Sequence, residues 1–331
     1  MISVIIPLYN VGCTIGPCLK AVFASRYEDY EVIVIDDGSK DDSVAIAAKF
    51  PVKLIRLPKN MGLSHARNTG EAHAQNDILV FIDADVMIRP DTLTIIDSFF
   101  EQHADVSGVV GLLDENCPHD GFFSQYKNLY MNFMFNKVSS PISFLYGSIH
   151  ALRKKDFQPY DESLAYSEDT DLGQKLSANG KKIFLLKNLL VTHLKQYGFY
   201  SILKNDFRIP FYWARLFFRY SDPLDLFSEK RFAHAGGSQI SSVLVAPAVV
   251  LLLVLSVCSG FIPLLIAGIL FLSFVCLNLD FFLFLFHKKG MRFAMRSIFF
   301  TVLDQNVMVS GIVVGAVHHL LCTFLLHQRT K

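Results

Sequence analysis

The stretch "ILVFIDADV", residues 78–86, determines the fold expected for this sequence. Its first five residues are apolar and bulky, which is typical of a buried β-strand. Asp83 and Asp85 follow directly, separated by one residue. Two carboxylates this close destabilise each other, and burying a carboxylate is unfavourable unless it is paired or bound to a metal. The sequence therefore predicts a positive charge at the end of this strand.

Strand-like and helix-like segments alternate around this stretch, from residue 1 to about residue 195. Short β-branched runs are each followed by an amphipathic pattern, which predicts βαβ units and a mostly parallel sheet. Ligands of such sheets bind beyond the carboxyl ends of the strands. The strands are expected at 3–9, 31–39, 53–57 and 77–85, and the helices at 13–25, 41–50 and 64–74. Asp36, Asp37, Asp83 and Asp85 should then cluster at one sheet edge.

Length, charge and cysteine content narrow the class of protein. The 331 residues suit about two domains, and 31 basic against 30 acidic residues give no overall charge that favours nucleic acid as a partner. The six cysteines form neither a CxxC pair nor an even framework, which favours reduced thiols. Met1 leads into a strand-like run without the basic region or cleavage site of a signal peptide. The N-terminal part, residues 1–196, is therefore expected in the cytosol.

The C-terminal part, residues 240–331, has the composition of a membrane region. A helix that spans a bilayer takes about 20 residues, and apolar segments at 243–258, 261–286 and 298–326 predict two spans and a weaker third. Basic residues precede the first segment and also fill the loop before the third. By the positive-inside rule both flanks are cytoplasmic, so the expected location is the cytoplasmic membrane.

Residues 197–235 connect the two parts. Aromatic and basic side chains interleave over 197–220, and Pro210 is expected to interrupt the run. Arg215 and Arg219 are four residues apart and would share a helix face. The pattern favours an amphipathic segment at the membrane interface, with an ordinary solvated surface helix as the alternative.

Several polar motifs carry candidate chemistry, each with a structural alternative. Asp83 and Asp85 offer the hard oxygen ligands that Mg²⁺ or Mn²⁺ prefers, or form a turn. Asp36 and Asp37, before Gly38, suit hydrogen bonds to a base or ribose, or an Asx turn.

A further acidic motif, "SEDTDLGQKL" (167–176), begins a predicted helix. Ser167 suits the N-cap, and the helix dipole favours carboxylates in the first turn. Alternatively, one carboxylate acts as a general base. His193 is either a further metal ligand or a histidine at a strand end.

In this order the motifs resemble family 2 glycosyltransferases of the GT-A fold, over roughly residues 1 to 200. The resemblance implies a Rossmann-like α/β domain, a nucleotide-sugar donor, inverting transfer and Mg²⁺ or Mn²⁺. Two features depart from the family: Asn10 is followed by Val11 and Gly12 where many members have acidic residues, and "RIPFYWARL" (208–216) replaces a Gln-rich motif of processive synthases. The segments that carry the resemblance are "SVIIPLYN", "VIDDGS", "NMGLSHARNTG", "ILVFIDADV", "YGSIHALRKKDF", "YDESLAYSEDTDLGQKLSANGKKI" and "VTH".

The resemblance also implies site residues. It places Asp169 as the catalytic base, with Glu168 orienting the acceptor or the base. Arg208 and Arg215 are expected to close over the diphosphate, because guanidinium matches phosphate oxygens bidentately. The remaining assignments are Pro7, Tyr9, Asp36 and Asp37 at the nucleoside, Arg67 and Asp83 at the donor, Asp83, Asp85 and His193 at the metal, and Gly147 and Ser148 at the acceptor pocket.

The expected function is sugar transfer, with a UDP-sugar favoured by family frequency, to a lipid or lipid-linked acceptor at the cytosolic membrane face. The Glu168–Asp169 pair favours a hydroxyl acceptor, because a phosphate acceptor is already ionised and needs no base. Polyprenyl phosphate stays open as an acceptor. A metal-dependent nucleotidyltransferase and an inactive membrane subunit are the alternatives. The segment 7–16 lacks the cation of a nucleotidyltransferase phosphate loop, and every expected carboxylate is present. The donor sugar, the linkage and the oligomeric state stay open.

Overall fold

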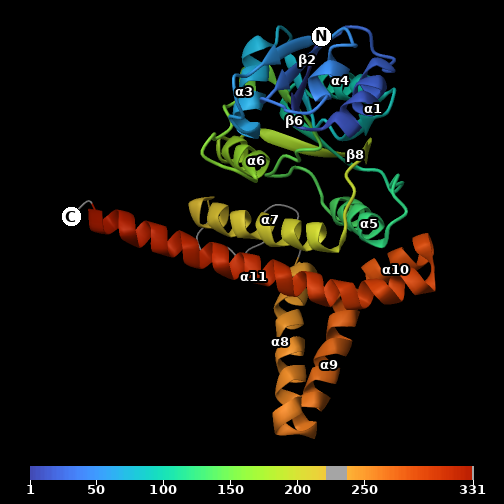
Figure 1. Ribbon diagram of the computed structural model, residues 1–331, viewed down its shortest axis with the longest axis vertical. Helices are drawn as coiled ribbons and strands as arrows, with labels where there is room; N and C mark the ends of the chain where they lie inside the picture. The colour runs from blue at the N-terminus through green and yellow to red at the C-terminus, as the bar shows by residue number, and fades with distance from the viewer. Residues whose placement is uncertain (221–236, 330–331) are drawn as a thin grey trace. The chain divides into compact units, whose positions relative to one another are not determined.

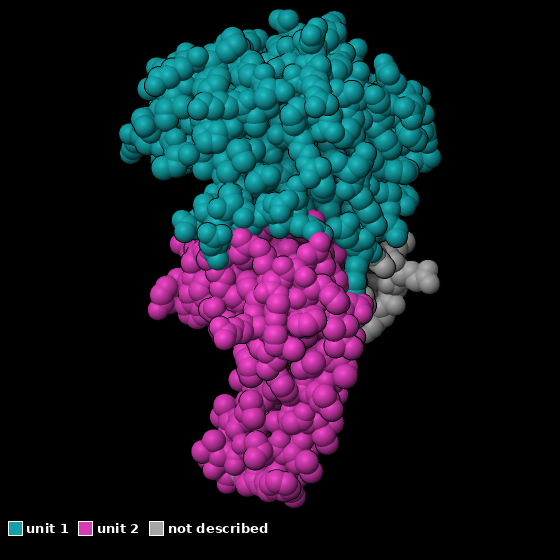
Figure 2. Space-filling view, turned by 90° about the vertical axis from the view of Figure 1, so that its right-hand side faces the viewer, with its two compact units in different colours: residues 1–120, 134–196 teal, residues 121–133, 197–331 magenta. Residues whose placement is uncertain are grey.

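The structure is a computed structural model that describes residues 1–220 and 237–329 (Figure 1). It divides into two compact units, residues 1–120 with 134–196 and residues 121–133 with 197–331 (Figure 2). The second unit takes in residues 121–133, a segment that the sequence analysis placed in the N-terminal domain.

An eight-stranded mixed sheet forms the core of the first unit, in the order β3-β2-β1-β4-β7-β6-β8-β5. Strands β3, β2, β1 and β4 are parallel, whereas β7 is antiparallel to both its neighbours and β5 is antiparallel to β8. The predicted GT-A-like, mostly parallel sheet is confirmed, and its second half is mixed. The strands are β1 (Ile2–Leu8), β2 (Tyr30–Asp36), β3 (Lys53–Arg56), β4 (Ile78–Ile82), β5 (Val86–Ile88), β6 (Val106–Leu113), β7 (Ile149–Arg153) and β8 (Lys182–His193).

The central strands of this sheet are apolar and buried. Every residue of β1, β4 and β6 is buried, as expected for strands covered on both faces. A Cβ on Gly70 of α3 would lie 2.3 Å from Ile5 Cγ2, so this glycine lets the helix pack closely on the sheet. The helices of the unit are α1 (Gly12–Phe23), α2 (Ser43–Ala47), α3 (Leu63–His73), α4 (Thr92–Gln102), the 3₁₀ turn η1 (Lys154–Asp156) and α6 (Glu168–Ala178).

The parallel half of the sheet brings polar strand ends together. Leu8, the last residue of β1, pairs with Asp36, the last residue of β2. Strand β4 runs parallel to β1 on its other side and ends at Ile82, directly before Asp83. Asp36 and Asp83 therefore lie at the same edge of the sheet, as predicted.

Helix α6 approaches the neighbouring loop closely at Gly173. A Cβ there would lie 2.4 Å from Phe144 Cα and 2.6 Å from Leu145 N, and backbone atoms cannot give way cheaply. We expect Gly173→Ala to destabilise the protein by about 1–3 kcal/mol, the usual effect of overpacking. Thermal unfolding checks this, with Gly16→Ala in α1 as the control, because its Cβ would meet only a side-chain methyl at 3.4 Å. An equal effect of both substitutions would contradict the explanation.

The second unit consists of helices. Pro210 lies inside α7, so the expected interruption there is wrong: the helix continues through the proline from Phe199 to Tyr220. The helices are α5 (Phe122–Asn136), whose last residues belong to the first unit, α7 (Phe199–Tyr220), α8 (Gly237–Ser259), α9 (Phe261–Leu277), α10 (Leu279–Lys289) and α11 (Met291–Arg329).

In the described residues two helices are long and apolar enough to cross a membrane, through Ser241–Cys258 of α8 and Met291–Thr323 of α11. Helices α9 and α10 pass that test only as a pair bent by 65°. The prediction of one continuous helix over 261–286 is therefore wrong. Asn278 ends α9, and its side-chain amide donates to the Phe274 carbonyl at 2.9 Å, the local competition by which Asn disfavours helix interiors.

Candidate active site

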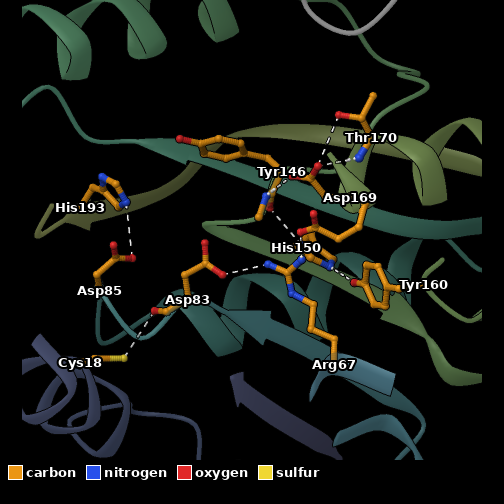
Figure 3. Close-up of polar contacts among 12 residues, drawn as sticks. Cys18, Arg67, Asp83, Asp85, Tyr146, His150, Tyr160, Asp169, Thr170 and His193 are labelled. Atoms are coloured by element: carbon orange, nitrogen blue, oxygen red, sulfur yellow. Dashed lines mark hydrogen bonds and ion pairs between the residues drawn. The ribbon is translucent and has the colours of Figure 1, made fainter. Parts of the chain in front are cut away.

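The two aspartates of the opening stretch lie in the turn between β4 and β5. The Val86 amide donates to the Asp83 carbonyl at 3.0 Å and closes this turn. The Arg67 guanidinium supplies the predicted positive charge, with Nη2 at 2.9 Å from Asp83 Oδ1 (Figure 3). Burial raises the pKa of Asp83 to about 6, against the opposing effect of Arg67.

Arg67 extends from α3 and is only 1% exposed. Its Nη1 donates to Glu168 Oε1 at 2.5 Å, so one guanidinium bridges carboxylates from the β4 end and from the first turn of α6. The ring of Tyr160 lies 5.4 Å from the guanidinium carbon and covers it. Both terminal nitrogens of Arg67 are thus bound to protein carboxylates, and its expected contact with the donor stays a prediction.

Gly147 is the point at which the charged groups meet. A Cβ on this glycine would lie 3.2 Å from Arg67 Nη2 and 3.3 Å from both Asp83 Oδ2 and Asp169 Oδ2. The Gly147 amide donates to Asp169 Oδ2 at 2.7 Å. Any side chain here would press on all three groups. Ser148, the next residue, is buried.

Asp169, the predicted base, is half-buried in the first turn of α6. Its Oδ1 accepts a hydrogen bond from the Thr170 amide at 2.6 Å, and its Oδ2 accepts the bond from Gly147. Burial and the neighbouring Glu168 carboxylate raise the pKa of Asp169 to about 7, against the effect of Arg67. A carboxylate with this pKa can take up a proton near neutral pH, as a general base must.

The backbone just before this pair is strained. Ser167 has a φ of 62° and occupies the N-cap position of α6, but its side chain makes no capping hydrogen bond. Asn10, at the end of β1, has a φ of 52°. These are the two non-glycine residues with positive φ in the described part of the chain. Both flank strand or helix ends of the candidate site, where such conformations tend to cluster.

Asp85 and His193 are brought together by the pairing of β5 with β8, in which Val86 lies opposite His193. His193 Nε2 lies 3.5 Å from Asp85 Oδ1. Although burial favours the neutral acid, the contact with His193 lowers the pKa of Asp85. Within residues 1–220 and 237–329 no group of three or more His, Cys, Asp or Glu side chains is arranged to hold a metal. A carboxylate beside an imidazole nevertheless suits Mn²⁺ or Mg²⁺, with Asp83 two residues away.

The predicted nucleoside residues lie at the ends of β1 and β2. Asp36 Oδ1 accepts from the Ser39 amide, three residues on, at 2.9 Å, and Gly38 in the intervening turn has a φ of 77°. Asp37 holds the loop before α3, because its two oxygens accept from the amides of Met61 and Gly62 at 2.6 and 2.9 Å. Pro7 is buried in β1, whereas Tyr9, just beyond it, is 43% exposed and available to a planar ligand.

Two residues behind the site escaped the sequence analysis. His150 Nδ1 lies 3.0 Å from the Tyr146 carbonyl, which can only accept, so this nitrogen carries the proton. His150 Nε2 then accepts from the Tyr160 hydroxyl at 2.6 Å. Burial lowers the pKa of His150 to about 3, so it stays neutral beneath Arg67. A lone histidine in an apolar strand gave no signal for this role.

Arg208 and Arg215 lie on α7, in the second unit. The Arg215 guanidinium stacks near the rings of Phe211 and Tyr212, at 5.9 and 5.7 Å from their centroids. The expected contact of Arg208 and Arg215 with a diphosphate stays a prediction.

The sheet order and the acidic turn after β4 define a GT-A-like domain. In agreement, the chain is similar to the mannosyltransferase PcManGT from Pyrobaculum calidifontis, solved in complex with GDP-Man and Mn²⁺, with a TM-score of 0.67 at 17% identity over 96% of this chain and 86% of that one. Residues 3–160 match the model of the family described as "Glycosyl transferase family 2". Residues 3–160 are therefore a family 2 glycosyltransferase domain.

Matches to curated relatives cover different shares of this chain and of each relative. Glycosyltransferase GlyA of Streptococcus pneumoniae is 28% identical over 220 residues, which are 62% of this chain and 31% of GlyA. An uncharacterized glycosyltransferase of Haemophilus influenzae is 38% identical over 28% of this chain and 39% of that protein. Glycosyltransferase GlyG of S. pneumoniae is 23% identical over 70% of this chain and 79% of GlyG. The matched regions thus span less than half of the first two relatives.

Proposed function

We propose that this protein is an inverting glycosyltransferase that moves a sugar from a nucleotide-diphosphate sugar to a hydroxyl acceptor. The observation that carries the proposal is the position of Asp169, a carboxylate with a pKa of about 7 that meets Asp83 and Arg67 around Gly147. A base beside the acidic turn suits removal of the acceptor proton as its oxygen attacks the anomeric carbon. A single displacement of this kind inverts the configuration.

In the proposed reaction each residue of the candidate site has a separate role. Asp169 takes the acceptor proton, Arg67 holds Asp83 and Glu168 in place, and Gly147 leaves room for the attacking oxygen. Tyr9 and the free side of Asp36 suit the nucleoside, and a UDP-sugar is favoured by family frequency. Asp85, His193 and Asp83 would hold Mg²⁺ or Mn²⁺, which when bound supplies positive charge for the leaving diphosphate.

The acceptor proposed is a lipid or a lipid-linked glycan at the cytosolic face of the cytoplasmic membrane. The apolar helix α8 and the bent apolar pair α9–α10 support membrane attachment, and basic residues beside them support a cytosolic catalytic domain. A hydroxyl acceptor needs a base such as Asp169 to remove its proton, whereas a phosphate acceptor is already ionised.

The test is release of nucleoside diphosphate from a panel of nucleotide sugars by detergent-purified protein, with Mn²⁺ or with EDTA. We expect release from one donor, its loss with EDTA, and a decrease of at least about 100-fold for Asp85→Ala, in the range of several kcal/mol that metal stabilisation supplies. Asp105→Ala is the matched control, because Asp105 lies at the amino end of β6 and pairs with Lys182. No release from any donor, even with membrane lipids, would favour an inactive subunit.

A further inference from the structure

We infer that α11 lies along the membrane surface, with its apolar face at the boundary between lipid headgroups and acyl chains, and does not cross the bilayer. By hydropathy this helix is a candidate span. Its 39 residues would measure about 58 Å, roughly twice the hydrocarbon thickness of a bilayer. The inference concerns the second unit alone and does not rest on the proposed reaction.

The two faces of α11 differ sharply. Of the ten exposed large apolar residues in residues 291–323, nine lie within about two fifths of the helix circumference at 100° per residue, and Ile312 is the exception. Buried polar and small residues occupy the opposite side. The exposed residues of this face are Met291, Met295, Phe299, Leu303, Val313, Val314, Val317, Leu320 and Leu321, and the buried ones are Ser297, Thr301, Asp304, Gln305, Gly311 and Gly315. A helix lying in the interface has this pattern.

The C-terminal half of α11 packs directly on α7. A Cβ on Gly311 would lie 2.3 Å from the Phe207 carbonyl oxygen, and a Cβ on Gly315 would lie 2.3 Å from that of Phe211. The two contacts are four residues apart on both helices, so α7 and α11 run side by side in the same direction and in close contact (Figure 1). Helix α7 carries Lys204, Asp206, Arg208, Arg215 and Arg219, and so many charges are not accommodated in hydrocarbon. Its partner α11 must stay at the same level.

The apolar hairpin of α8 and α9 fixes that level. Ser242 is the second residue of the apolar window of α8, and Asn278 follows the last residue of α9, so both lie at the open end of the hairpin. Asn278 Nδ2 donates to Ser242 Oγ at 2.6 Å, and Ser242 Oγ donates to Gln305 Oε1 at 2.7 Å. Gln305, near the middle of α11, therefore lies where the hairpin ends. In a crossing helix it would lie near the bilayer centre.

Buried charges at the same place support this position. Asp304 is 2% exposed, and the charged groups that act on it are Asp206 of α7 and Lys127 of α5. Lys127 and Asp206 form an ion pair. Tyr126 of α5 bonds the Thr301 hydroxyl at 2.9 Å. Helix α11 is thus covered on one side by polar helices, which leaves only its exposed apolar face for lipid.

A phospholipid bilayer is the partner that fits this exposed face. The face continues from the apolar hairpin, whose side chains are also largely exposed. Lys288, Lys289, Arg292 and Arg296 are exposed at its N-terminal end, where they match the charge of anionic headgroups. Helix α11 together with α7 then forms a platform on the cytosolic leaflet.

The first test places epitope tags before residue 1 and after residue 331 and digests sealed membrane vesicles with protease. If α11 lies in the interface, both tags are cleaved from the same side. If α11 crosses, the tags are cleaved from opposite sides, and the inference is overturned. The tags leave the fold untouched, so the result does not depend on a destabilised variant.

The second test measures depth with nitroxide labels on the full chain in liposomes of phosphatidylglycerol and phosphatidylcholine. Labels at Phe299, Val313 and Val317 should all show equal, shallow depth, with Leu253 of α8 as the deep reference and exposed Lys204 as the aqueous one. A label at Val313 as deep as one at Leu253 would show that α11 crosses. Water exposure of all three labels would show that the face does not rest on lipid, and would also overturn the inference.

Discussion

Asp169→Asn is expected to slow sugar transfer by on the order of 10²–10⁴-fold, the contribution of a positioned general base. Asparagine keeps an oxygen for the Gly147 amide but cannot take up the acceptor proton. In the wild type, kcat/KM should rise with pH and level off above about 7, because only the ionised form of Asp169 acts as a base. The variant should lose this rise. Initial rates from pH 5.5 to 8.5 with an acceptor lipid measure both effects.

Stability provides the control for this substitution. Folding raises the pKa of Asp169 from 3.8 to about 7, so between these values the folded state holds a proton that the unfolded chain has released. Stability attributable to this group therefore falls as pH rises through that window. Asp169→Asn removes this charge but also one of the two acceptor oxygens, so its Tm should depend less on pH than the wild-type Tm does. A rate that survives the substitution would remove Asp169 from the role of base.

Arg67→Met is expected to destabilise the protein by about 3–5 kcal/mol and to abolish transfer, because it leaves the buried Glu168 and the half-buried Asp83 without their cation. Asp83 and Glu168 both bind this guanidinium, and burial already opposes the ionised form of Asp83. Thermal unfolding in detergent and donor hydrolysis measure the two effects.

A second substitution separates structure from chemistry. Glu168→Gln in the Arg67→Met background removes one unpaired charge and should restore part of the lost Tm, but no activity. Arg67→Lys keeps the charge and loses the two-pronged geometry, so it should fall between wild type and Arg67→Met. An unchanged Tm in Arg67→Met would show that the bridge adds no net stability.

The parallel half of the sheet and its acidic edge were predictable, because apolar β-branched runs alternate with amphipathic helices over the first 85 residues. A positive charge beside Asp83 was also predictable, because two carboxylates at the end of a buried strand are unfavourable without one. The source of that charge was not, since Arg67 and Glu168 are 101 residues apart in sequence and meet only in the folded domain. The resemblance supplied Asp169, whereas local pattern alone fitted an ordinary helix start equally well.

The errors in the C-terminal half also have physical reasons. A proline usually ends a helix, but the packing of α7 within its unit outweighs that preference at Pro210. One apolar run can hold two helices when a single asparagine binds its own backbone, as Asn278 does. Hydropathy counted the apolar residues of α11 correctly, but it does not report that most of the exposed ones lie on one face.

The bridge at Arg67 also sets the order in which a nascent chain can become active. When the ribosome has made residues 1 to about 100, Arg67 and Asp83 are present, but Glu168 is not. Strand β5, which carries the acidic turn onward, pairs only with β8 in the described structure and must wait for residues 182–193. Synthesis is vectorial, so the last segments of the domain to emerge are those that complete its centre. A chain truncated before residue 168 would thus lack both the Arg67–Glu168 contact and the pairing of β5 with β8 on which the candidate site depends.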